Sequence, residues 1–358
     1  MANQKPEPQE MTEVKIAYIG GGSRQWARTV VQDLALCPGL RGHLALYDID
    51  YPAARRNCEW ARAVFGHPQA RARFSVSVHR KLAPALRGAQ FVFISILPGP
   101  MTMMASDIDI PARYGILQPV GDTTGPGGVV RALRSVPIYM EFARAVMESC
   151  PEAWVVSFSN PMALCVAALY RAAPQIKAYG YCHEVMFTRR LLARLVEQYL
   201  GVEAADWREV ELEVAGVNHF TLARSASWRG HDLFPMLERH ISAPGFFADR
   251  TADALRRKAE GRWFQSDELV KFDFFRRFGV LGAAGDRHLV EFVPWYLRSE
   301  AELHRWGVVL TPSSYRLRSR PERPESGPIE VPAALRRSGQ EVLDQVCALV
   351  GLGDLEAT

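Results

Sequence analysis

The sequence predicts an α/β fold in which a doubly wound parallel sheet is followed by a C-terminal α+β part. Three observations lead to this fold class. Short apolar segments alternate with helix-like segments up to residue 201, as in proteins with a parallel sheet. The first apolar segment runs into a glycine-rich turn and a helix, and after residue 202 the apolar segments become longer.

Six segments rich in β-branched and aromatic residues are predicted strands: 14–20, 43–49, 71–79, 91–97, 154–159 and 176–182. Predicted helices between them cover residues 24–36, 52–65, 128–149 and 161–173. Continuous apolar runs such as FVFISIL, residues 91–97, are typical of parallel strands that are buried on both faces.

The C-terminal part has a different pattern. Residues 208–220 and 221–230 predict longer strands, followed by loops and helices to about residue 318. Residues 318–328 are rich in proline and charge and predict a loop, and a last helix is expected over about 333–350. We therefore expect a loose tail over 1–13, a nucleotide-binding α/β domain over 14–201 and an α+β domain over 202–358, which completes the site and forms subunit contacts.

Composition and charge narrow the class of protein. The 358 residues carry a formal net charge of +4, and basic and acidic residues are interspersed, which predicts no nucleic-acid or membrane partner. No apolar run approaches the roughly 20 residues that span a bilayer. The polar N-terminus lacks the apolar stretch of a signal peptide, and the six scattered cysteines form no CxxC pair. These features predict a cytoplasmic protein.

The first predicted strand leads into a nucleotide-binding signal. Glycines let a backbone approach a pyrophosphate, and a helix N-terminus favours the negative charge of the phosphates. Asp48 ends the second strand, where a carboxylate can accept hydrogen bonds from the ribose hydroxyls of NAD. The predicted NAD contacts are Gly20, Gly21, Gly22, Ser23 and Asp48.

The context of this turn is more specific than the turn alone. The third glycine of the usual motif is replaced by Gln25, but strand, glycines, helix and acid follow in the order of a Rossmann-type site. Asp48 favours NAD over NADP, and the neighbouring Arg24 and Arg55 leave NADP open.

Two further segments end in side chains that bind metals. The strand over 176–182 ends in Cys182, with His183 directly after it, and a later strand ends in His219. Ligands collect at the carboxyl ends of strands in an open α/β sheet. If the two ends converge, a thiolate and an imidazole could hold manganese, iron, cobalt or zinc. Taken singly, each residue is more often a packing or capping contact.

Three other segments could carry chemistry. Asp122 lies in a glycine-dense stretch, which predicts either a flexible connector or a pocket wall that presents a carboxylate. Asn160 follows a strand and is either an N-cap with Pro161 next to it or a contact to substrate and cofactor. The run of Asp286, Arg287 and His288 is either a surface turn or part of a site.

Taken together, these motifs resemble glycoside hydrolase family 4. The matching segments span most of the chain in the expected order: KIAYIGGGS, LYDID, GDTTGPGGVVRALRSVP, SFSNPM, GYCHE, GVNHF and GDRHLVEFVPWYL. Within the family, Cys-His at 182–183 looks like the branch that acts on non-phosphorylated α-glycosides. The CHEV and GDRHLVEF segments look closest to the α-galacturonidases.

The resemblance implies a glycosidase that departs from the usual pair of carboxylates. NAD would oxidise the C3 hydroxyl of the sugar, and Mn²⁺ or another divalent metal would polarise the ketone. A base would then remove the C2 proton, the C1 substituent would be eliminated, water would add, and NADH would restore C3. A homodimer or homotetramer is also implied.

The resemblance also implies roles for single residues. Cys182 and His219 match the metal ligands, and His183 and Asn160 match positions close to substrate or metal. Asp122 matches a proposed acid. The phosphoglycosidases place a tyrosine base in the region where this chain has Asp286, Arg287 and His288. We favour Asp286 as the base and His288 next, because imidazole can accept a proton near neutral pH.

A uronate substrate needs a guanidinium for its carboxylate. Arg287 is the preferred candidate, and Arg131 and Arg134 are others, although helix arginines are usually solvated or in structural ion pairs. Specificity for α-galactosides, α-glucosides or α-glucuronides stays open. Two other classes are also open: a dehydrogenase of the lactate/malate type, which needs no thiolate–metal site, and an NAD-binding sensor without catalysis.

Overall fold

The computed structural model describes residues 11–23, 25–319, 329–337 and 342–349. The chain divides into two compact units. The first unit comprises Met1–Pro98, Ser135–Tyr181 and Arg323–Thr358, and the second comprises Gly99–Arg134 and Cys182–Glu322. This grouping is discontinuous in the sequence, unlike the single boundary expected after residue 201, because residues 99–134 belong with the second unit.

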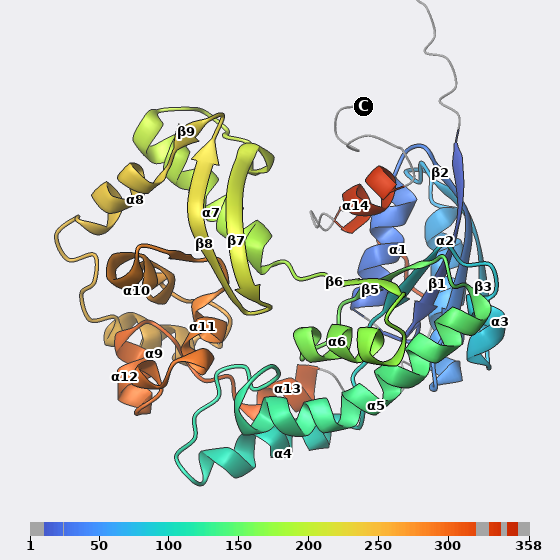
Figure 1. The fold of residues 1–358 in the computed structure, drawn as a ribbon, viewed down its shortest axis with the longest axis horizontal. Coiled ribbons are helices and arrows are strands. Elements are labelled where there is room, and N and C mark those ends of the chain that lie inside the picture. The colour runs from blue at the N-terminus through green and yellow to red at the C-terminus, as the bar shows by residue number, and fades with distance from the viewer. Residues whose placement is uncertain (1–10, 24, 320–328, 338–341, 350–358) are drawn as a thin grey trace, which may run out of the picture. The chain divides into compact units, whose positions relative to one another are not determined.

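The first unit contains the predicted parallel sheet, with strand order β3-β2-β1-β4-β5-β6 (Figure 1). Its strands are β1 Thr12–Ile19, β2 Leu40–Tyr47, β3 Arg73–His79, β4 Phe91–Ile94, β5 Trp154–Ser157 and β6 Lys177–Gly180. All neighbouring pairs are parallel. The order reverses between β1 and β4, which is the doubly wound topology that the sequence predicted.

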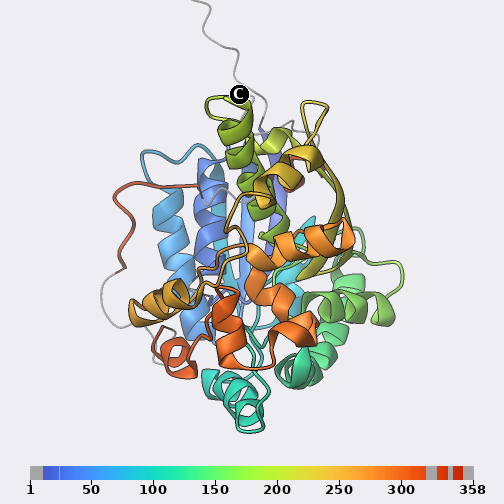
Figure 2. The ribbon, with the colours of Figure 1, turned by 90° about the vertical axis from the view of Figure 1, so that its left-hand side faces the viewer.

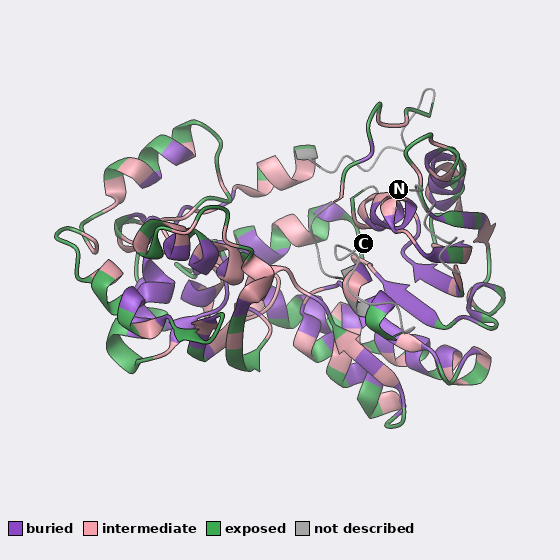
Figure 3. Cartoon of the chain, turned by 90° about the horizontal axis from the view of Figure 1, so that it is seen from above, coloured by how far each residue is buried: buried purple, intermediate pink, exposed green. Residues whose placement is uncertain are grey.

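Helices cover both faces of this sheet. On β1, Val14, Ile16 and Tyr18 pack toward α1, α2 and α14, whereas Ala17 and Ile19 pack toward α5 and α6. Successive side chains on a strand point to opposite faces, so the continuous apolar runs follow from burial on both sides. Figure 3 shows these strands in the colour of buried residues. Figure 2 shows α1 and α2, in blue, side by side.

The helices of the first unit are α1 Trp26–Leu36, α2 Tyr51–Phe65, α3 Leu82–Leu86, α6 Met162–Ala172 and α14 Val342–Leu349. The long helix α5, Gly125–Ser149, passes from the second unit into the first after Arg134. The four helices predicted between the strands, observed as α1, α2, α5 and α6, differ little from their predicted bounds. Burial of a large aliphatic side chain stabilises a fold by about 1.5–3 kcal/mol, and strands and helices both supply such side chains here.

The second unit has an antiparallel sheet with order β10-β8-β7, and β9 pairs with β8. Its strands are β7 Val210–Val217, β8 Phe220–Trp228, β9 His231–Asp232 and β10 Leu281–Gly282. Its helices are α4 Met101–Ala112, α7 Glu184–Leu200, α8 Phe234–Ile241, α9 Thr251–Ala259, α10 Leu269–Phe278, α11 Asp286–Phe292, α12 Glu300–Arg305 and α13 Ser313–Ser319, with 3₁₀ turns η1 Trp207–Glu209 and η2 Pro294–Tyr296. This is the α+β part that the sequence predicted.

The last helix begins later than expected. It was predicted from about residue 333, but α14 begins at Val342, and residues 329–337 are not helical. Tertiary contacts hold this stretch: Trp60 donates to the carbonyl of Glu330, and the N–H of Leu335 donates to Gln69. Leu335 itself is buried in the core. Residues 1–10 of the tail expected over 1–13 lie outside the described residues, and its last two residues already belong to β1, which begins at Thr12. Most of the expected loop over 318–328 also lies outside the described residues.

Candidate functional site

The glycine-rich turn follows β1 and is shaped by close backbone contacts in the first unit. Gly20 has φ +90°, and a Cβ there would lie 2.0 Å from the carbonyl oxygen of Ser95. Only glycine fits this position. The N–H of Gly22 donates to Asp48 Oδ2 at 2.8 Å, and Ser23 Oγ accepts from the first residue of α1. The turn therefore forms a concave backbone surface, and a side chain added at Gly20 would collide with its surroundings.

Asn57 in α2 forms hydrogen bonds to this turn, and the sequence did not predict this role. Its Nδ2 donates to the carbonyls of Gly21 and Ser23 at 2.8 and 2.9 Å, and Arg28 Nε donates to its Oδ1. A polar residue within a helix carries no sequence signal for such a role. Burial raises the pKa of Asp48 although three backbone N–H groups, from Asp50, Gly22 and Ile49, favour its ionised form.

Asn160, Arg55 and Arg24 were the other residues that the sequence placed near the nucleotide. Asn160 lies just after β5, at the carboxyl end of the sheet, and the N-cap position of α6 is taken by Pro161, one residue later than expected. Its peptide bond to Pro161 is cis. Arg55 forms an ion pair with Glu59 in the same helix, and Arg24 lies outside the described residues.

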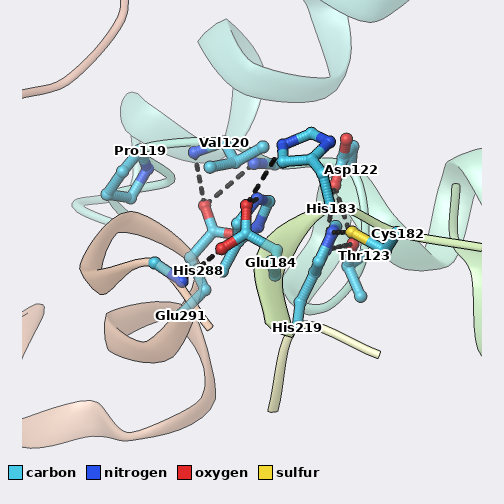
Figure 4. Close-up of polar contacts among 12 residues, drawn as sticks. Pro119, Val120, Asp122, Thr123, Cys182, His183, Glu184, His219, His288 and Glu291 are labelled. Atoms are coloured by element: carbon cyan, nitrogen blue, oxygen red, sulfur yellow. Dashed lines mark hydrogen bonds and ion pairs between the residues drawn. The ribbon is translucent and has the colours of Figure 1, made fainter. Parts of the chain in front are cut away.

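Cys182 and His219 lie together in the second unit, as the resemblance implied (Figure 4). Cys182 precedes α7, and its Sγ lies 3.5 Å from His219 Nε2. His219 is 2% exposed and sits in the tight turn between β7 and β8 with φ +68°. A non-glycine residue in this region costs about 1–3 kcal/mol, which is typical of functional positions. Gly216 permits the hairpin, since a Cβ there would lie 2.3 Å from the carbonyl oxygen of Phe220.

Asp122 and Thr123 reach the same place from the glycine-dense loop. Thr123 Oγ1 donates to Asp122 Oδ1 at 2.7 Å and lies 2.7 Å from His219 Nδ1. The glycines serve packing: a Cβ at Gly127 would lie 2.7 Å from the carbonyl oxygen of Gly121, and one at Gly128 2.4 Å from the carbonyl carbon of Thr123. The loop therefore packs closely against the start of α5 and places the carboxylate of Asp122 beside His219.

His288 completes a cluster of potential metal ligands. One ligand atom each from Asp122, His219 and His288 lies within 4.8 Å of the others. The rings of His219 and His288 stack with centroids 3.5 Å apart and planes at 22°. His288 Nδ1 is buried and has no hydrogen-bond partner among the residues that the structure describes. Together with Cys182, the cluster offers sulfur, nitrogen and oxygen, a donor set that suits a borderline divalent ion.

Burial and nearby charges set the protonation of this cluster. Burial is the main reason that the pKa values of His219 and His288 are lowered to about 4, so both rings are neutral at pH 7. Burial would raise the pKa of Asp122, but Arg131 and the two histidines hold it below its usual range. Burial, with the charge of Glu184, raises the pKa of Cys182 to about 12. A metal ion would have to displace the thiol proton.

Asp286 is not part of this cluster. It is fully buried, and its two carboxylate oxygens accept the N–H groups of Val270 and Lys271, both at 3.0 Å, at the start of α10. Burial raises its pKa to about 7. The structure therefore gives this residue a capping contact in place of an open position from which it could take a substrate proton.

Arg287 and Glu291 in α11 hold the loop that carries Asp122. Arg287 Nη2 donates to the carbonyl of Pro119 and to Thr311, and burial lowers its pKa to about 10. Glu291 Oε1 accepts the N–H groups of Val120 and Gly121 at 2.6 and 2.8 Å (Figure 4). Glu291 was not predicted, although it lies in the quoted segment GDRHLVEF.

His183 and Glu184 stand at the edge of the cluster. His183 Nε2 lies 3.5 Å from Glu184 Oε1, which is also 3.7 Å from His288 Nε2. Glu184 Oε2 accepts the N–H of Gly285. Glu184 thus links the start of α7 to the residue before α11, whereas the sequence only marked it as a neighbour of Cys182.

Comparison with known proteins identifies the family. Residues 15–198 match the sequence model described as family 4 glycosyl hydrolase, and residues 214–354 match the model of the C-terminal domain of the same family. The chain belongs to the family 4 glycosyl hydrolases. The resemblance drawn from the motifs is confirmed, and the alternative of a lactate/malate-type dehydrogenase falls away.

Within family 4, the chain is similar to curated α-galacturonidases. It is 43% identical to that of Thermoanaerobacterium saccharolyticum over 354 residues, which cover 96% of this chain and 75% of the relative. It is 41% identical to that of Bacillus subtilis, with 96% and 76% covered. An α-galactosidase of Bacillus subtilis is 30% identical over 79% of this chain.

Solved family structures share the fold. The protein lplD of Bacillus subtilis superposes with a TM-score of 0.84 at 38% identity, covering 96% of this chain and 78% of that chain. A 6-phospho-α-glucosidase from gut microorganisms, solved with NAD and Mn²⁺, has a TM-score of 0.56 at 25% identity, covering 65% and 52%. Among the described residues of this family 4 chain, none of the helices combines the length and apolar character needed to cross a membrane.

Proposed function

We propose that this chain is an α-galacturonidase that uses NAD and a divalent metal, with Mn²⁺ as the first candidate. The observation that carries the proposal is the meeting of Cys182 Sγ and His219 Nε2 at 3.5 Å, in a cluster with Asp122 and His288. The four curated relatives at 40–43% identity, all named α-galacturonidase, support the substrate.

The first unit would hold NAD. The turn from Gly20 to Ser23 has the cradle into which a pyrophosphate fits, because a Cβ at Gly20 would collide with backbone. Asp48 stands at the end of β2 for the ribose, and Asn160 at the end of β5 for nicotinamide or sugar. Asn57 keeps the turn in place through its contacts to Gly21 and Ser23.

The second unit would hold the metal and the reacting carbons. When bound, NAD⁺ accepts hydride from C3 of the sugar, and the metal polarises the C3 oxygen so that the C2 proton becomes acidic. Cys182 and His219 would bind the metal. Removal of the C2 proton would let the C1 substituent leave with a proton. Addition of water, return of a solvent proton to C2 and return of the hydride from NADH to C3 would then give the free sugar.

His288 fits the base better than Asp286. The ring is neutral at pH 7, lies in the cluster, and its Nδ1 has no hydrogen-bond partner in the described part of the chain. Both oxygens of Asp286 are occupied by backbone N–H groups. Asp122 is stabilised as an anion, which suits a metal ligand or proton acceptor better than the acid implied by the resemblance.

The carboxylate of the uronate would need a guanidinium. Arg287 remains the proposed contact, with His183 beside the sugar, although Arg287 Nη2 already binds Pro119 and Thr311. Arg131 is the second candidate, because it is buried and its charge acts on Asp122. Arg134 is less suitable, since both of its terminal nitrogens contact Asp107.

We also infer a cytoplasmic homodimer or homotetramer without nucleic-acid or membrane partners. The six cysteines all lie in the described part of the chain and all are free thiols, which supports a reducing compartment. Gel filtration with light scattering would measure the oligomeric state directly.

A panel of aryl glycosides tests the proposed substrate. p-Nitrophenyl α-galacturonide, α-glucuronide, α-galactoside and α-glucoside would be compared with and without NAD⁺ and Mn²⁺ under reducing conditions. We expect turnover of the galacturonide that needs both additions and is lost in Cys182→Ser. Preference for α-galactoside would move the substrate to that of the 30% identical relative, and turnover without NAD⁺ or metal would contradict the proposal.

A further inference from the structure

The hydroxyl of Thr123 lies between two groups of the metal cluster. Its Oγ1 is 2.7 Å from Asp122 Oδ1 and 2.7 Å from His219 Nδ1. Both distances are those of good hydrogen bonds. All three residues belong to the second unit, and Figure 4 shows Asp122, Thr123 and Cys182 grouped around His219.

A threonine hydroxyl has only one hydrogen to donate. An aspartate in its usual ionised form only accepts, so the hydrogen of Thr123 goes to Asp122. The contact to His219 must then run the other way, with Nδ1–H of the ring donating to Thr123 Oγ1. The three side chains therefore form a directed chain of hydrogen bonds, which we call the relay: His219 donates to Thr123, and Thr123 donates to Asp122.

The relay decides which nitrogen of His219 can bind a metal. A neutral imidazole carries its hydrogen on one nitrogen and a lone pair on the other. With the hydrogen on Nδ1, the lone pair is on Nε2, which faces Cys182 Sγ at 3.5 Å. In metal sites, the hydrogen bond of the distal ring nitrogen commonly fixes the tautomer and the ring orientation.

The surrounding backbone keeps this relay in place. Thr123 is packed against Gly128, where a Cβ would lie 2.4 Å from the carbonyl carbon of Thr123. His219 is held in a left-handed turn and is 2% exposed. His219 therefore cannot move far to find another partner, so loss of the hydroxyl would leave its buried Nδ1–H without this acceptor.

We propose that Thr123 is a positioning residue for the metal site, which fixes His219 in the tautomer whose Nε2 lone pair faces Cys182. This inference rests on the proposed function only in taking Cys182 and His219 as the metal ligands. It adds a role for a residue that would not touch the metal, and it explains why Thr123 stands next to Asp122 in the loop.

Thr123→Val tests the inference, because valine keeps the shape and removes the hydroxyl. Titration calorimetry would measure Mn²⁺ binding to the NAD-loaded protein. We expect the Kd of Mn²⁺ to rise by about 10- to 100-fold, the usual cost of losing such a partner of a metal-binding histidine. Thr123→Ser retains the hydroxyl and should restore the Kd to within about 3-fold of the original chain.

Thr124→Val is the matched control, because it makes the same change one residue along the same loop. Its Mn²⁺ affinity should equal that of the original chain, and NAD affinity should be unchanged in all three variants if they are folded. Equal Mn²⁺ affinity of Thr123→Val and the original chain would overturn the inference. Failure of the original chain to bind Mn²⁺ would instead contradict the proposed function.

Discussion

Asp286 and His288 are two residues apart in α11, yet their surroundings suit them to different roles. Asp286 is fully buried beneath the start of α10, where its oxygens accept two N–H groups. His288 stacks on His219 and belongs to the metal cluster. The sequence placed both in one motif and favoured Asp286 as the base. Burial and hydrogen bonding, which the motif does not encode, favour His288.

Paired variants separate these two roles. His288→Asn should lower kcat by about 10²- to 10⁴-fold, the range expected for loss of a general base. Asp286→Asn should retain kcat within about 3-fold and lower the free energy of unfolding by about 1–3 kcal/mol, because an amide cannot accept with both atoms. Kinetics on the aryl galacturonide and urea unfolding would measure both. The opposite ranking in kcat would restore Asp286 as the base.

Gly20 allows a sharper prediction than most glycines in the chain. Gly20→Ala places a Cβ 2.0 Å from the carbonyl oxygen of Ser95 at φ +90°. Gly88 has φ +68° and open space around the added Cβ, so Gly88→Ala is a control for backbone strain alone. We expect about 1–2 kcal/mol of destabilisation for Gly88→Ala with unchanged NAD affinity. Gly20→Ala should lose more stability and bind NAD at least 10-fold more weakly, and equal effects would contradict the contact.

At the scale of elements, α11 organises one wall of the metal cluster. His288 lies in the cluster, while Arg287 and Glu291 of the same helix hold the backbone at Pro119, Val120 and Gly121. The helix α11 therefore supports both the proposed base, His288, and the loop that carries Asp122. The β7–β8 hairpin supports His219 in the same way.

Glu291 makes the α11 contact dependent on pH. Burial raises its pKa to about 7, against about 4.3 in an unfolded chain. The protonated side chain therefore contributes stability that is complete below about pH 4.3 and is lost as pH rises through about 7. Glu291→Gln keeps the acceptor without titrating. The unfolding free energy of the original chain should fall relative to this variant by up to about 1.4 kcal/mol per pH unit in that window.

Urea unfolding of the two proteins at a series of pH values from 4 to 8 would measure this difference. The lowered pKa values of His219 and His288 act with the opposite sign, since their stability is lost as pH falls below about 6.5 toward about 4. Both proteins share those histidines, so the difference isolates Glu291. A difference that does not change with pH would contradict a buried, protonated Glu291.

At the scale of the whole molecule, the sequence predicted the parallel sheet, the glycine turn and the pairing of Cys182 with His219. These features are encoded by periodicity and by motifs at strand ends. Asn57 and Thr123 were missed because a polar residue in a helix or beside a motif has many possible partners. The grouping of residues 99–134 with the second unit depends on contacts far apart in the sequence, which no local pattern predicts.

Because the two candidate sites lie in different units, NAD and metal should protect different segments. Hydrogen exchange with mass spectrometry should show that NAD slows exchange around residues 20–23 and 48–50. Mn²⁺ should slow exchange around 119–124, 182–185 and 216–220. Chelation of the metal should reverse only the second pattern. Protection by Mn²⁺ that spares the loop over 119–124 would contradict its place in the metal site.

The most direct test of the central claim is hydrolysis of an aryl α-galacturonide in D₂O, with the product examined by NMR. Removal and return of the C2 proton predicts deuterium at C2 of the released galacturonate. A parallel incubation of free galacturonate with the enzyme controls for exchange after release. Product that keeps hydrogen at C2 at full turnover would contradict the oxidation–elimination account and favour direct hydrolysis at C1.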